Sequence, residues 1–341
     1  MKTLISVIIP SFNREAFIAE TLDSVLAQSD PLWECIVVDD GSTDETIKVI
    51  QKYVDKDDRF RLIERQRSPK GANTCRNIGS EVAKGDYLIF LDSDDILHKD
   101  LVKTALESFS ESGLEALAFY CAIYESENWD NPQIHNYLEN ENKDLLSRFL
   151  TLDLPWITSS VVWEKAAFLK KGKWNEELQS WQDWDLFCRA LSNDLKVRSV
   201  KKISYFWRIG VTHDRISNAN SNTESIKKRF LSLLSVTRAL VKNNKHLKYE
   251  SHVGALAFFW CSDLLRSGLK ADAFDMWKDI GKVKALKRYS YFKGLTGLYF
   301  ILIINKIRNF LGFFIGEGLN NKMWRIKPQY LKVKIQYDEL S

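Results

Sequence analysis

Two aspartates placed two positions apart, Asp92 and Asp94, have the spacing in this sequence that points most directly to chemistry. They follow an apolar run that is typical of a buried strand, so both carboxylates point the same way along an extended backbone. Two like charges held so close repel each other, and a divalent cation relieves the repulsion. Hard oxygen ligands suit Mg²⁺ or Mn²⁺, which in turn binds a diphosphate. The alternative is an ordinary acidic loop in which Asp95 caps the following helix.

A second acidic pair, Asp39 and Asp40, closes another buried apolar run. An ionised carboxylate only accepts hydrogen bonds, so either residue could bind the imide N–H of a pyrimidine or the hydroxyls of a ribose. The alternative is an Asp-Gly turn in which Asp40 serves the local backbone. Ser42 and Glu45 follow directly, and their spacing predicts a capping box at the start of the next helix.

Two cations, Lys70 and Arg76, flank the start of a helix predicted over residues 72–82. Gly71 and Gly79 add flexible backbone beside them, and the whole is typical of a site that binds an anion such as a diphosphate. The alternative for Arg76 is a solvated position on the helix surface.

Asp183 and Asp185 begin another predicted helix, over residues 183–191. Successive helical residues turn by about 100°, so these two carboxylates cannot share a face. One of them can therefore face a cleft while the other caps the helix or meets solvent. Arg189 is expected to return near the Asp183 side.

The elements that must position these residues alternate between strand and helix over the first part of the chain. Buried apolar runs predict strands at residues 4–9, 35–38, 60–63 and 87–91. Strands that alternate with helices predict an α/β fold with a doubly wound, mostly parallel sheet, whose ligands bind at the carboxyl ends of the strands. Further short strands are expected at 160–163 and 204–207, and only helices beyond about residue 223.

Five segments, taken in order, resemble the family 2 glycosyltransferases of the GT-A fold, of the type that builds bacterial cell-surface polysaccharides. They are residues 6–14, 37–44, 71–79, 91–95 and 182–189. In addition, residues 172–176 resemble the loop that leads to the family's catalytic aspartate. We therefore expect a Rossmann-like GT-A domain at 1–220, with a nucleotide-binding half at 1–95 and an acceptor-binding half at 96–220. A helical carboxyl-terminal region at 221–341 would follow.

The resemblance implies roles for individual positions. Asp183 would be the general base, although Gln182 stands where the family often has Glu. Asp94 would ligate the metal, with Asp92 and His213 as further metal residues. Binding of the nucleotide sugar would fall to a set of residues from the strand ends: Pro10, Phe12, Asn13, Arg14, Asp39, Asp40, Lys70, Arg76, Asp92 and Ser93.

The expected activity is therefore an inverting, metal-dependent sugar transfer. A nucleotide sugar, in our interpretation a UDP-sugar, would donate to a hydroxyl of a glycan or a lipid-linked acceptor, with Mg²⁺ or Mn²⁺ as cofactor. One alternative is a sugar nucleotidyltransferase, but its Gly-rich loop after the first strand is replaced here by residues 10–14, without a glycine. The other alternative is a sugar-nucleotide-binding protein without activity, against which the presence of both Asp94 and Asp183 argues.

Composition and charge narrow the partners and the compartment. The chain has 49 basic and 45 acidic residues, a balance that gives no reason to expect nucleic-acid binding. Its five cysteines are scattered, and a strand rather than a signal peptide is expected at the amino terminus, so we expect a cytoplasmic protein.

An apolar stretch at residues 295–315 is interrupted by charged side chains and followed by a basic tail. Its uninterrupted apolar runs are far shorter than a membrane-spanning helix needs. We expect this stretch either to lie on an anionic surface at the inner face of the membrane or to pack as a plain helical cap.

Overall fold

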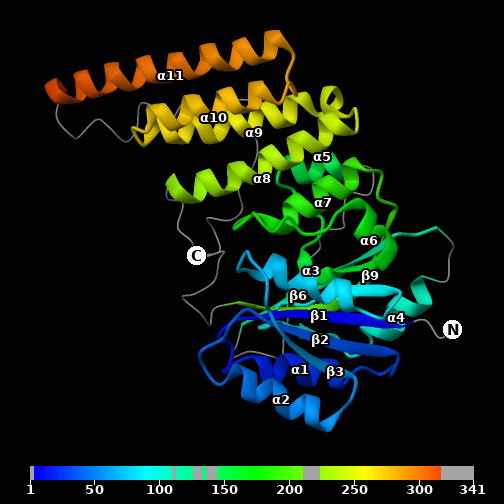
Figure 1. Ribbon diagram of the computed structural model, residues 1–341. Coiled ribbons are helices and arrows are strands. Elements are labelled where there is room, and N and C mark those ends of the chain that lie inside the picture. The colour runs from blue at the N-terminus through cyan, green and yellow to red at the C-terminus, as the bar shows by residue number, and fades with distance from the viewer. Residues whose placement is uncertain (1–3, 110–112, 126–132, 136–143, 210–222, 316–341) are drawn as a thin grey trace. The chain divides into compact units, whose positions relative to one another are not determined.

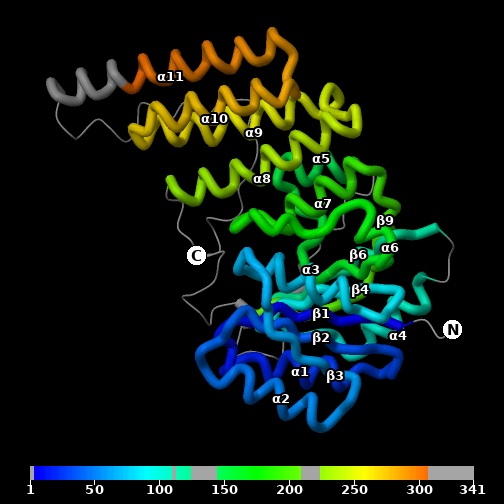
Figure 2. The backbone as a smooth tube through the Cα atoms, in the orientation of Figure 1, coloured from blue at the N-terminus to red at the C-terminus, as the bar shows by residue number. Residues whose placement is uncertain are grey.

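The computed structural model describes residues 4–109, 113–125, 133–135, 144–209 and 223–315. The chain divides into two compact units (Figures 1 and 2). The first consists of Met1–Leu145 with Leu154–Asn218, and the second of Leu146–Asp153 with Ala219–Ser341. The first unit contains the sheet, and the second contains the carboxyl-terminal helices.

Four parallel strands form one half of the sheet, in the spatial order β3-β2-β1-β4. They are β1 (Ile5–Ser11), β2 (Trp33–Asp39), β3 (Phe60–Glu64) and β4 (Tyr87–Phe90). Every residue of β1 and β2 is buried, as apolar strands covered on both faces must be. Their register sets Ser11 beside Asp39, so both strands end at the same edge. The parallel α/β core expected from the sequence is confirmed.

Beyond β4 the sheet becomes mixed. The strand β8 (Val161–Glu164) pairs antiparallel with β4, and the sheet continues through β6 (Ala116–Glu125), β9 (Val197–Ile209) and β5 (Ile96–Leu97). A short β7 (Gln133–His135) pairs with β6. The strand expected at residues 204–207 is part of a longer strand, β9, which pairs with β6 from Val197 onward. The first part of β9 is polar, so it has no apolar pattern that would indicate a strand.

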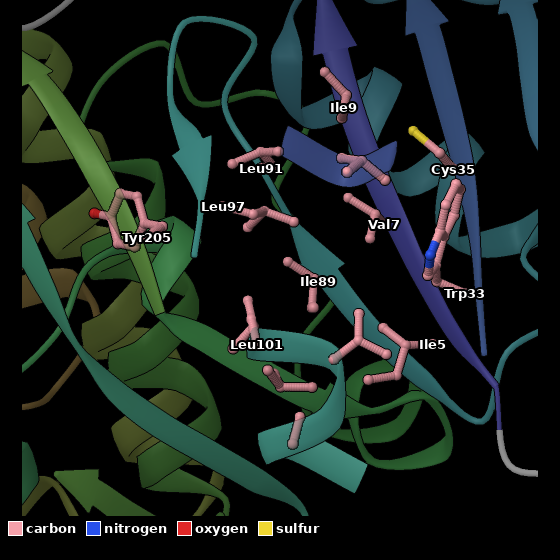
Figure 3. Packing of buried hydrophobic residues seen from close by; sticks show 14 of the residues in the cluster. Ile5, Val7, Ile9, Trp33, Cys35, Ile89, Leu91, Leu97, Leu101 and Tyr205 are labelled. Atoms are coloured by element: carbon pink, nitrogen blue, oxygen red, sulfur yellow. The ribbon is translucent and has the colours of Figure 1, made fainter. Parts of the chain in front are cut away.

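One face of the sheet carries the main apolar core. Alternate residues of β1, namely Ile5, Val7 and Ile9, point into it (Figure 3). Helices α1 (Ile18–Leu26), α2 (Thr46–Lys56) and α4 (Leu101–Ser108) contribute buried aliphatic side chains to the same cluster. This spacing of two along the strand is what directs the remaining β1 residues to the opposite face.

Helix α3 (Ala72–Val82) covers the opposite face of β1. A Cβ atom at Gly79 would lie 2.4 Å from Cγ2 of Ile8, so only glycine allows α3 to approach the sheet this closely. The same face carries α6 (Lys165–Lys171) and α7 (Gln182–Ser192). Phe187 of α7 stacks on Trp163 of β8 with nearly parallel rings, 6.0 Å between centroids.

The second unit is helical. It contains α8 (Thr223–Lys242), α9 (His246–Arg266), α10 (Lys270–Lys282) and α11 (Arg288–Ile315), with most of α5 (Leu145–Leu150). Helix α9 packs against α8, α10 and α11. Among the described residues, no helix combines the length and the apolar character that crossing a membrane requires. Over residues 223–315, which the structure describes, the expected helical region is confirmed.

Candidate active site

The loops that follow β1 and β2 are fastened to each other. Asn13 lies in the left-handed region at φ 51°, which asparagine tolerates better than most residues. Its N–H donates to Oγ of Ser42 at 2.9 Å, and its Oδ1 accepts from the N–H of Thr43 at 2.8 Å. Asn13, expected to bind the nucleotide, therefore also holds two strand ends together. The predicted capping box is wrong, because Ser42 is used here and α2 begins only at Thr46.

Asp39 organises the turn that follows β2. Its Oδ2 accepts from the N–H groups of Gly41 and Ser42, both at 2.8 Å, and its Oδ1 accepts from Oγ of Ser42 at 2.5 Å. Asp39 is fully buried. The turn-forming role that the sequence offered for Asp40 thus falls to Asp39, and recognition of a base by Asp39 stays a prediction.

Asp40 holds the loop that leads into α3. It forms an ion pair with Nε of Arg65 and accepts from the N–H of Gly71 at 3.2 Å. Burial, followed by the nearby charge of Asp40, raises the pKa of the Cys75 thiol to about 12. Arg65 was missed from the sequence, although its place just after β3 is the same strand-end signal that marked the other loops.

Phe12 and Lys70, both expected at the nucleotide site, come together. The Nζ atom of Lys70 lies 3.5 Å from the centroid of the Phe12 ring, a cation–π contact. Both side chains are exposed, Phe12 to 39%. Arg14 instead turns back on its own loop, donating to the carbonyl oxygen of Asn13 at 3.1 Å, and Pro10 is buried within β1.

Arg76 and Asp92 form the central ion pair of the site. Nη2 of Arg76 lies 2.6 Å from Oδ1 of Asp92, and the guanidinium lies over the ring of Trp174 at 4.4 Å. Arg76 is buried, so the reading as a solvated helical residue is wrong. Its Nε has no hydrogen-bond partner among the described residues. A buried cation with a spare donor is suited to binding an anion.

Asp183 lies in the first turn of α7, where its charge interacts with both members of that pair. Burial raises the pKa of Asp183 above its usual value. A hydrogen bond from the N–H of Trp184 (2.8 Å) and the charge of Arg76 lower this pKa, and the charge of Asp92 raises it. A carboxyl group with a raised pKa, next to a fixed cation, is typical of a general base.

Asp185 is turned the other way, as the helical geometry predicts. It is fully buried, and its Oδ2 accepts from Nε of Arg189 at 2.7 Å. Arg189 therefore serves Asp185, and the expectation that it returns near Asp183 is wrong. Trp181, the residue before α7, lies in the left-handed region at φ 52°. For a bulky side chain this conformation is strained, and such strain is concentrated at functional sites.

The loop after β4 presents the candidate metal ligands. Asp92 and Asp94 are partly exposed, whereas Ser93 is buried. No group of three or more His, Cys, Asp and Glu side chains within the described ranges could hold an ion alone. However, Mg²⁺ is commonly bound by one or two carboxylates together with substrate phosphates. The carboxylates of Asp92 and Asp94 fit such an ion. His213 lies outside the described residues.

Backbone contacts fix this loop in place. Oγ1 of Thr21 donates to the carbonyl oxygen of Ser93 at 3.1 Å, and Nε of Arg208 donates to that of Asp94 at 3.1 Å. The carboxylate of Asp95 accepts from the N–H of Arg208 at 3.3 Å. Asp95 was expected to cap the following helix, but α4 begins after Asp100, so that expectation is wrong.

Glu176 links the loop before α7 to α3. It accepts from Nη1 and Nη2 of Arg67 at 2.5 and 2.8 Å and from Nδ2 of Asn77 at 2.8 Å. Burial alone would raise the pKa of Glu176, but these hydrogen bonds bring it below its usual value. Asn77 also brackets Trp174, accepting from its N–H and donating to its carbonyl oxygen.

A second amide extends this link. Nδ2 of Asn73 donates to the carbonyl oxygen of Asn175 at 2.7 Å. The loop that leads into α7, and so to Asp183, is thus held on the helix that carries Arg76. Arg67 and Asn73 were missed, because nothing local to either residue indicates a partner about a hundred positions away.

Comparison with known proteins identifies the first unit. A family model described as "Glycosyl transferase family 2" matches residues 6–173. The chain carries a family 2 glycosyltransferase domain. The matched region includes the loops after β1, β2 and β4, with Arg76, Asp92 and Asp94, and it ends before α7. The family match therefore does not itself cover Asp183.

The domain has curated relatives of known name. It is 44% identical over 110 residues to "Putative teichuronic acid biosynthesis glycosyltransferase TuaG" of Bacillus subtilis, covering 32% of this chain and 43% of that protein. It is 34% identical over 114 residues to "Poly(ribitol-phosphate) beta-N-acetylglucosaminyltransferase TarS" of Staphylococcus aureus, covering 33% and 20%. The chain spans less than half the length of these relatives.

Solved structures share the fold. A crystal structure of Staphylococcus aureus TarS residues 1–349 in complex with UDP-GlcNAc superposes with a TM-score of 0.62 at 19% identity, covering 91% of this chain and 92% of that one. The mannosyltransferase PcManGT from Pyrobaculum calidifontis, in complex with GDP-Man and Mn²⁺, gives 0.51 at 15% identity, covering 91% and 88%. These likenesses establish the GT-A fold that the sequence predicted.

Proposed function

We propose that the protein is an inverting, metal-dependent glycosyltransferase with its catalytic domain in residues 1–220. It would transfer a sugar from a UDP-sugar to a hydroxyl of a glycan or a lipid-linked acceptor. The observation that carries the proposal is the electrostatic coupling of Asp183 to Arg76 and Asp92, two residues within the segment that matches the family 2 glycosyltransferases. The three residues come from α3, the loop after β4 and α7, and together offer a cation, a metal-binding carboxylate and a base.

Asp183 would act as the general base. An acceptor hydroxyl is a poor nucleophile, so a carboxylate within hydrogen-bond reach must take its proton as the new bond forms. The raised pKa makes Asp183 a stronger base than an ordinary aspartate. A single displacement at the anomeric carbon requires one base opposite the leaving group, and it inverts the configuration at that carbon.

Arg76 and the Asp92–Asp94 loop would hold the diphosphate. Arg76 supplies a positive charge on helix α3, and the exposed Lys70 supplies another in the loop just before this helix. Mg²⁺ or Mn²⁺ held by Asp94, with Asp92 beside it, would offset the negative charge that gathers on the departing nucleoside diphosphate. Phe12 would offer an exposed ring to the nucleobase.

The relatives support a role in cell-surface polymers. The names of TuaG and TarS refer to teichuronic acid and to poly(ribitol phosphate). Among the solved structures, TarS contains UDP-GlcNAc whereas PcManGT contains GDP-Man, and sequence similarity to TarS favours the uridine nucleotide. All five cysteines are free and buried, in agreement with a reducing compartment.

One experiment tests the proposal and both alternatives. The purified chain is incubated with a panel of UDP- and GDP-sugars, with Mn²⁺ or with EDTA, and the released phosphate species are identified. We expect metal-dependent release of a nucleoside diphosphate, slowed strongly in Asp183→Asn. Pyrophosphate consumption or release would instead indicate a nucleotidyltransferase. Tight donor binding without any turnover, on water or on a glycan acceptor, would indicate a binding protein.

A further inference from the structure

Helix α11 carries an exposed apolar stripe. Five large side chains between its first and sixteenth residues are 50–77% exposed: Tyr289, Phe292, Tyr299, Phe300 and Ile303. At about 100° per residue they fall within one sector of the helix roughly 100° wide. We call these five residues the outer face of α11. Isolated exposed apolar residues are ordinary, but five on one face of one helix are typical of an interaction surface.

The opposite face of α11 is packed within the second unit. A Cβ at Gly294 would lie 2.1 Å from Cζ2 of Trp277, and Leu298 is fully buried. Tyr291 stacks on Trp277 with ring centroids 5.8 Å apart. Figure 1 shows α11 running alongside α9 and α10. The helix therefore packs as part of the second unit, and this packing fixes the direction in which the outer face points.

A helix that is apolar all round normally has both faces covered. Here packing within the second unit accounts for one face. On the outer face, Tyr299 has the Phe274 ring of α10 as a neighbour at 4.9 Å, and Phe292 has the Tyr291 ring of α11 itself at 5.7 Å. The remaining apolar surface requires a partner of its own. The charge around it indicates the chemistry of that partner.

The sequence of α11 and of the segment before it is basic, although α10 also carries the exposed Asp275 beside Phe274. From Ile280 to Gly316 the sequence has no acidic residue and seven basic ones: Lys282, Lys284, Lys287, Arg288, Lys293, Lys306 and Arg308. The first five are exposed. Two of the nearby carboxylates on α10 are already paired, Asp279 with Lys282 and Asp272 with Lys227.

We propose that the outer face of α11 binds the surface of an anionic membrane. Phe292, Phe300 and Ile303 would enter the boundary between head groups and acyl chains, while the flexible lysines reach the phosphates. Tyrosine side chains, apolar with a polar tip, suit the same boundary. The proposal concerns the second unit alone and does not depend on the reaction proposed above.

A second copy of the chain fits this face less well. In a twofold-symmetric dimer each residue of the patch meets the same patch, so Arg288 and Lys293 would face their own like charges. The tail at residues 317–341 also fits less well, because it carries five basic and three acidic residues and would bring further positive charge. Anionic lipid matches both the apolar stripe and its basic border.

Co-sedimentation with vesicles tests the proposal. The full chain is mixed with vesicles of phosphatidylcholine alone or with added phosphatidylglycerol, at low and high salt. We expect binding to the anionic vesicles only, weakened by salt, since charge near a lipid surface is screened. The triple variant Phe292→Ser, Phe300→Ser, Ile303→Ser should lower the partition coefficient by roughly tenfold or more, and Arg288→Glu with Lys293→Glu should do the same.

The matched control is Leu231→Ser with Leu247→Ser, which removes apolar side chains that are 52% and 57% exposed on α8 and α9. It should bind vesicles as the unchanged chain does, and all variants should keep the melting temperature of the unchanged chain. Equal binding to neutral vesicles, or an equal loss in the control, would overturn the proposal. So would a dimer in light scattering that the triple variant converts to a monomer while neither protein binds lipid.

Discussion

Nη2 of Arg76 lies 2.6 Å from Oδ1 of Asp92, and this ion pair joins helix α3 to the loop after β4. Both charges also act on Asp183, where Arg76 lowers the pKa and Asp92 raises it. The candidate base, the candidate metal carboxylate and the diphosphate-binding cation are thus one electrostatic unit. A substitution at one of them is expected to change the behaviour of the other two.

Replacing Asp183 with Asn should lower turnover by about 10² to 10⁴, the usual contribution of a general base. Donor binding should stay nearly intact, because the amide keeps the shape and removes only the proton acceptor. The measurement is kcat by nucleoside diphosphate release, with donor affinity from calorimetry. Glu177→Gln, at an exposed residue in the loop before α7, is the control and should be silent. Turnover near that of the unchanged enzyme would rule Asp183 out as the base.

The same substitution should stabilise the fold. The pKa of Asp183 is raised in the folded state, so ionisation opposes folding once the pH exceeds the ordinary carboxyl pKa, and fully so above the folded-state pKa. Asp183→Asn should therefore melt at a higher temperature than the unchanged chain at pH 7, without donor or metal. The gap should close as the pH falls below the ordinary carboxyl pKa. An unchanged or lower melting temperature at pH 7 would contradict the raised pKa.

The acid limb of the pH–rate profile should respond to the ion pair. The base must be ionised, so kcat/KM falls as the pH drops through the pKa of Asp183. Asp92→Asn removes a charge that raises this pKa and should move the limb to lower pH, whereas Arg76→Gln should move it to higher pH. The two profiles are compared at saturating metal. If neither acid limb shifts, or if both shift in the same direction, the limb reports the titration of a group other than Asp183.

Asp94→Ala should abolish metal-dependent binding of the nucleoside diphosphate. Asp92→Ala should be milder for the metal, but it leaves the buried guanidinium of Arg76 without its carboxylate, so it should also lower the melting temperature. Titration calorimetry with UDP, with and without Mn²⁺, separates the two effects. If the Asp94 variant keeps its metal-dependent affinity, the ion is held elsewhere.

Glu176→Gln should reduce turnover roughly 10- to 100-fold through position alone, because small displacements of a catalytic group are costly. The carboxylate ties the loop before α7 to Arg67 and Asn77, and this loop leads into the first turn of α7, which carries Asp183. The donor KM should change little, while Arg67→Ala should show the same split between kcat and KM. A variant that loses donor affinity but keeps its turnover would place Glu176 in the binding site instead.

The sequence predicts the site loops well, because apolar strand runs and parallel pairing act locally. Ser11 and Asp39 end adjacent strands in register, so Phe12 and Asn13 were bound to lie near Ser42. The opposed directions of Asp183 and Asp185 likewise follow from helical geometry alone.

Pairings across long stretches of chain could not be predicted in this way. Arg67 and Glu176 are 109 positions apart, and several other carboxylates could have satisfied the same arginine. The capping box failed for a related reason: Ser42 had a local partner in Glu45, but the distant N–H of Asn13 took its hydroxyl oxygen. The left-handed Trp181 has no sequence signal at all, since glycine or asparagine would be the usual residue there.

The contact between Gly79 and Ile8 sets how closely helix α3 approaches the sheet. One added methyl at residue 79 would push the helix outward, and trimming Ile8 to alanine, which removes both contacting Cγ atoms, would restore part of that close approach. No charged residue would be replaced, but Arg76 would move with helix α3, whereas Asp92, just after β4, would keep its place. Paired changes at residues 79 and 8 would therefore adjust the 2.6 Å distance between Arg76 and Asp92 without replacing either residue of that ion pair.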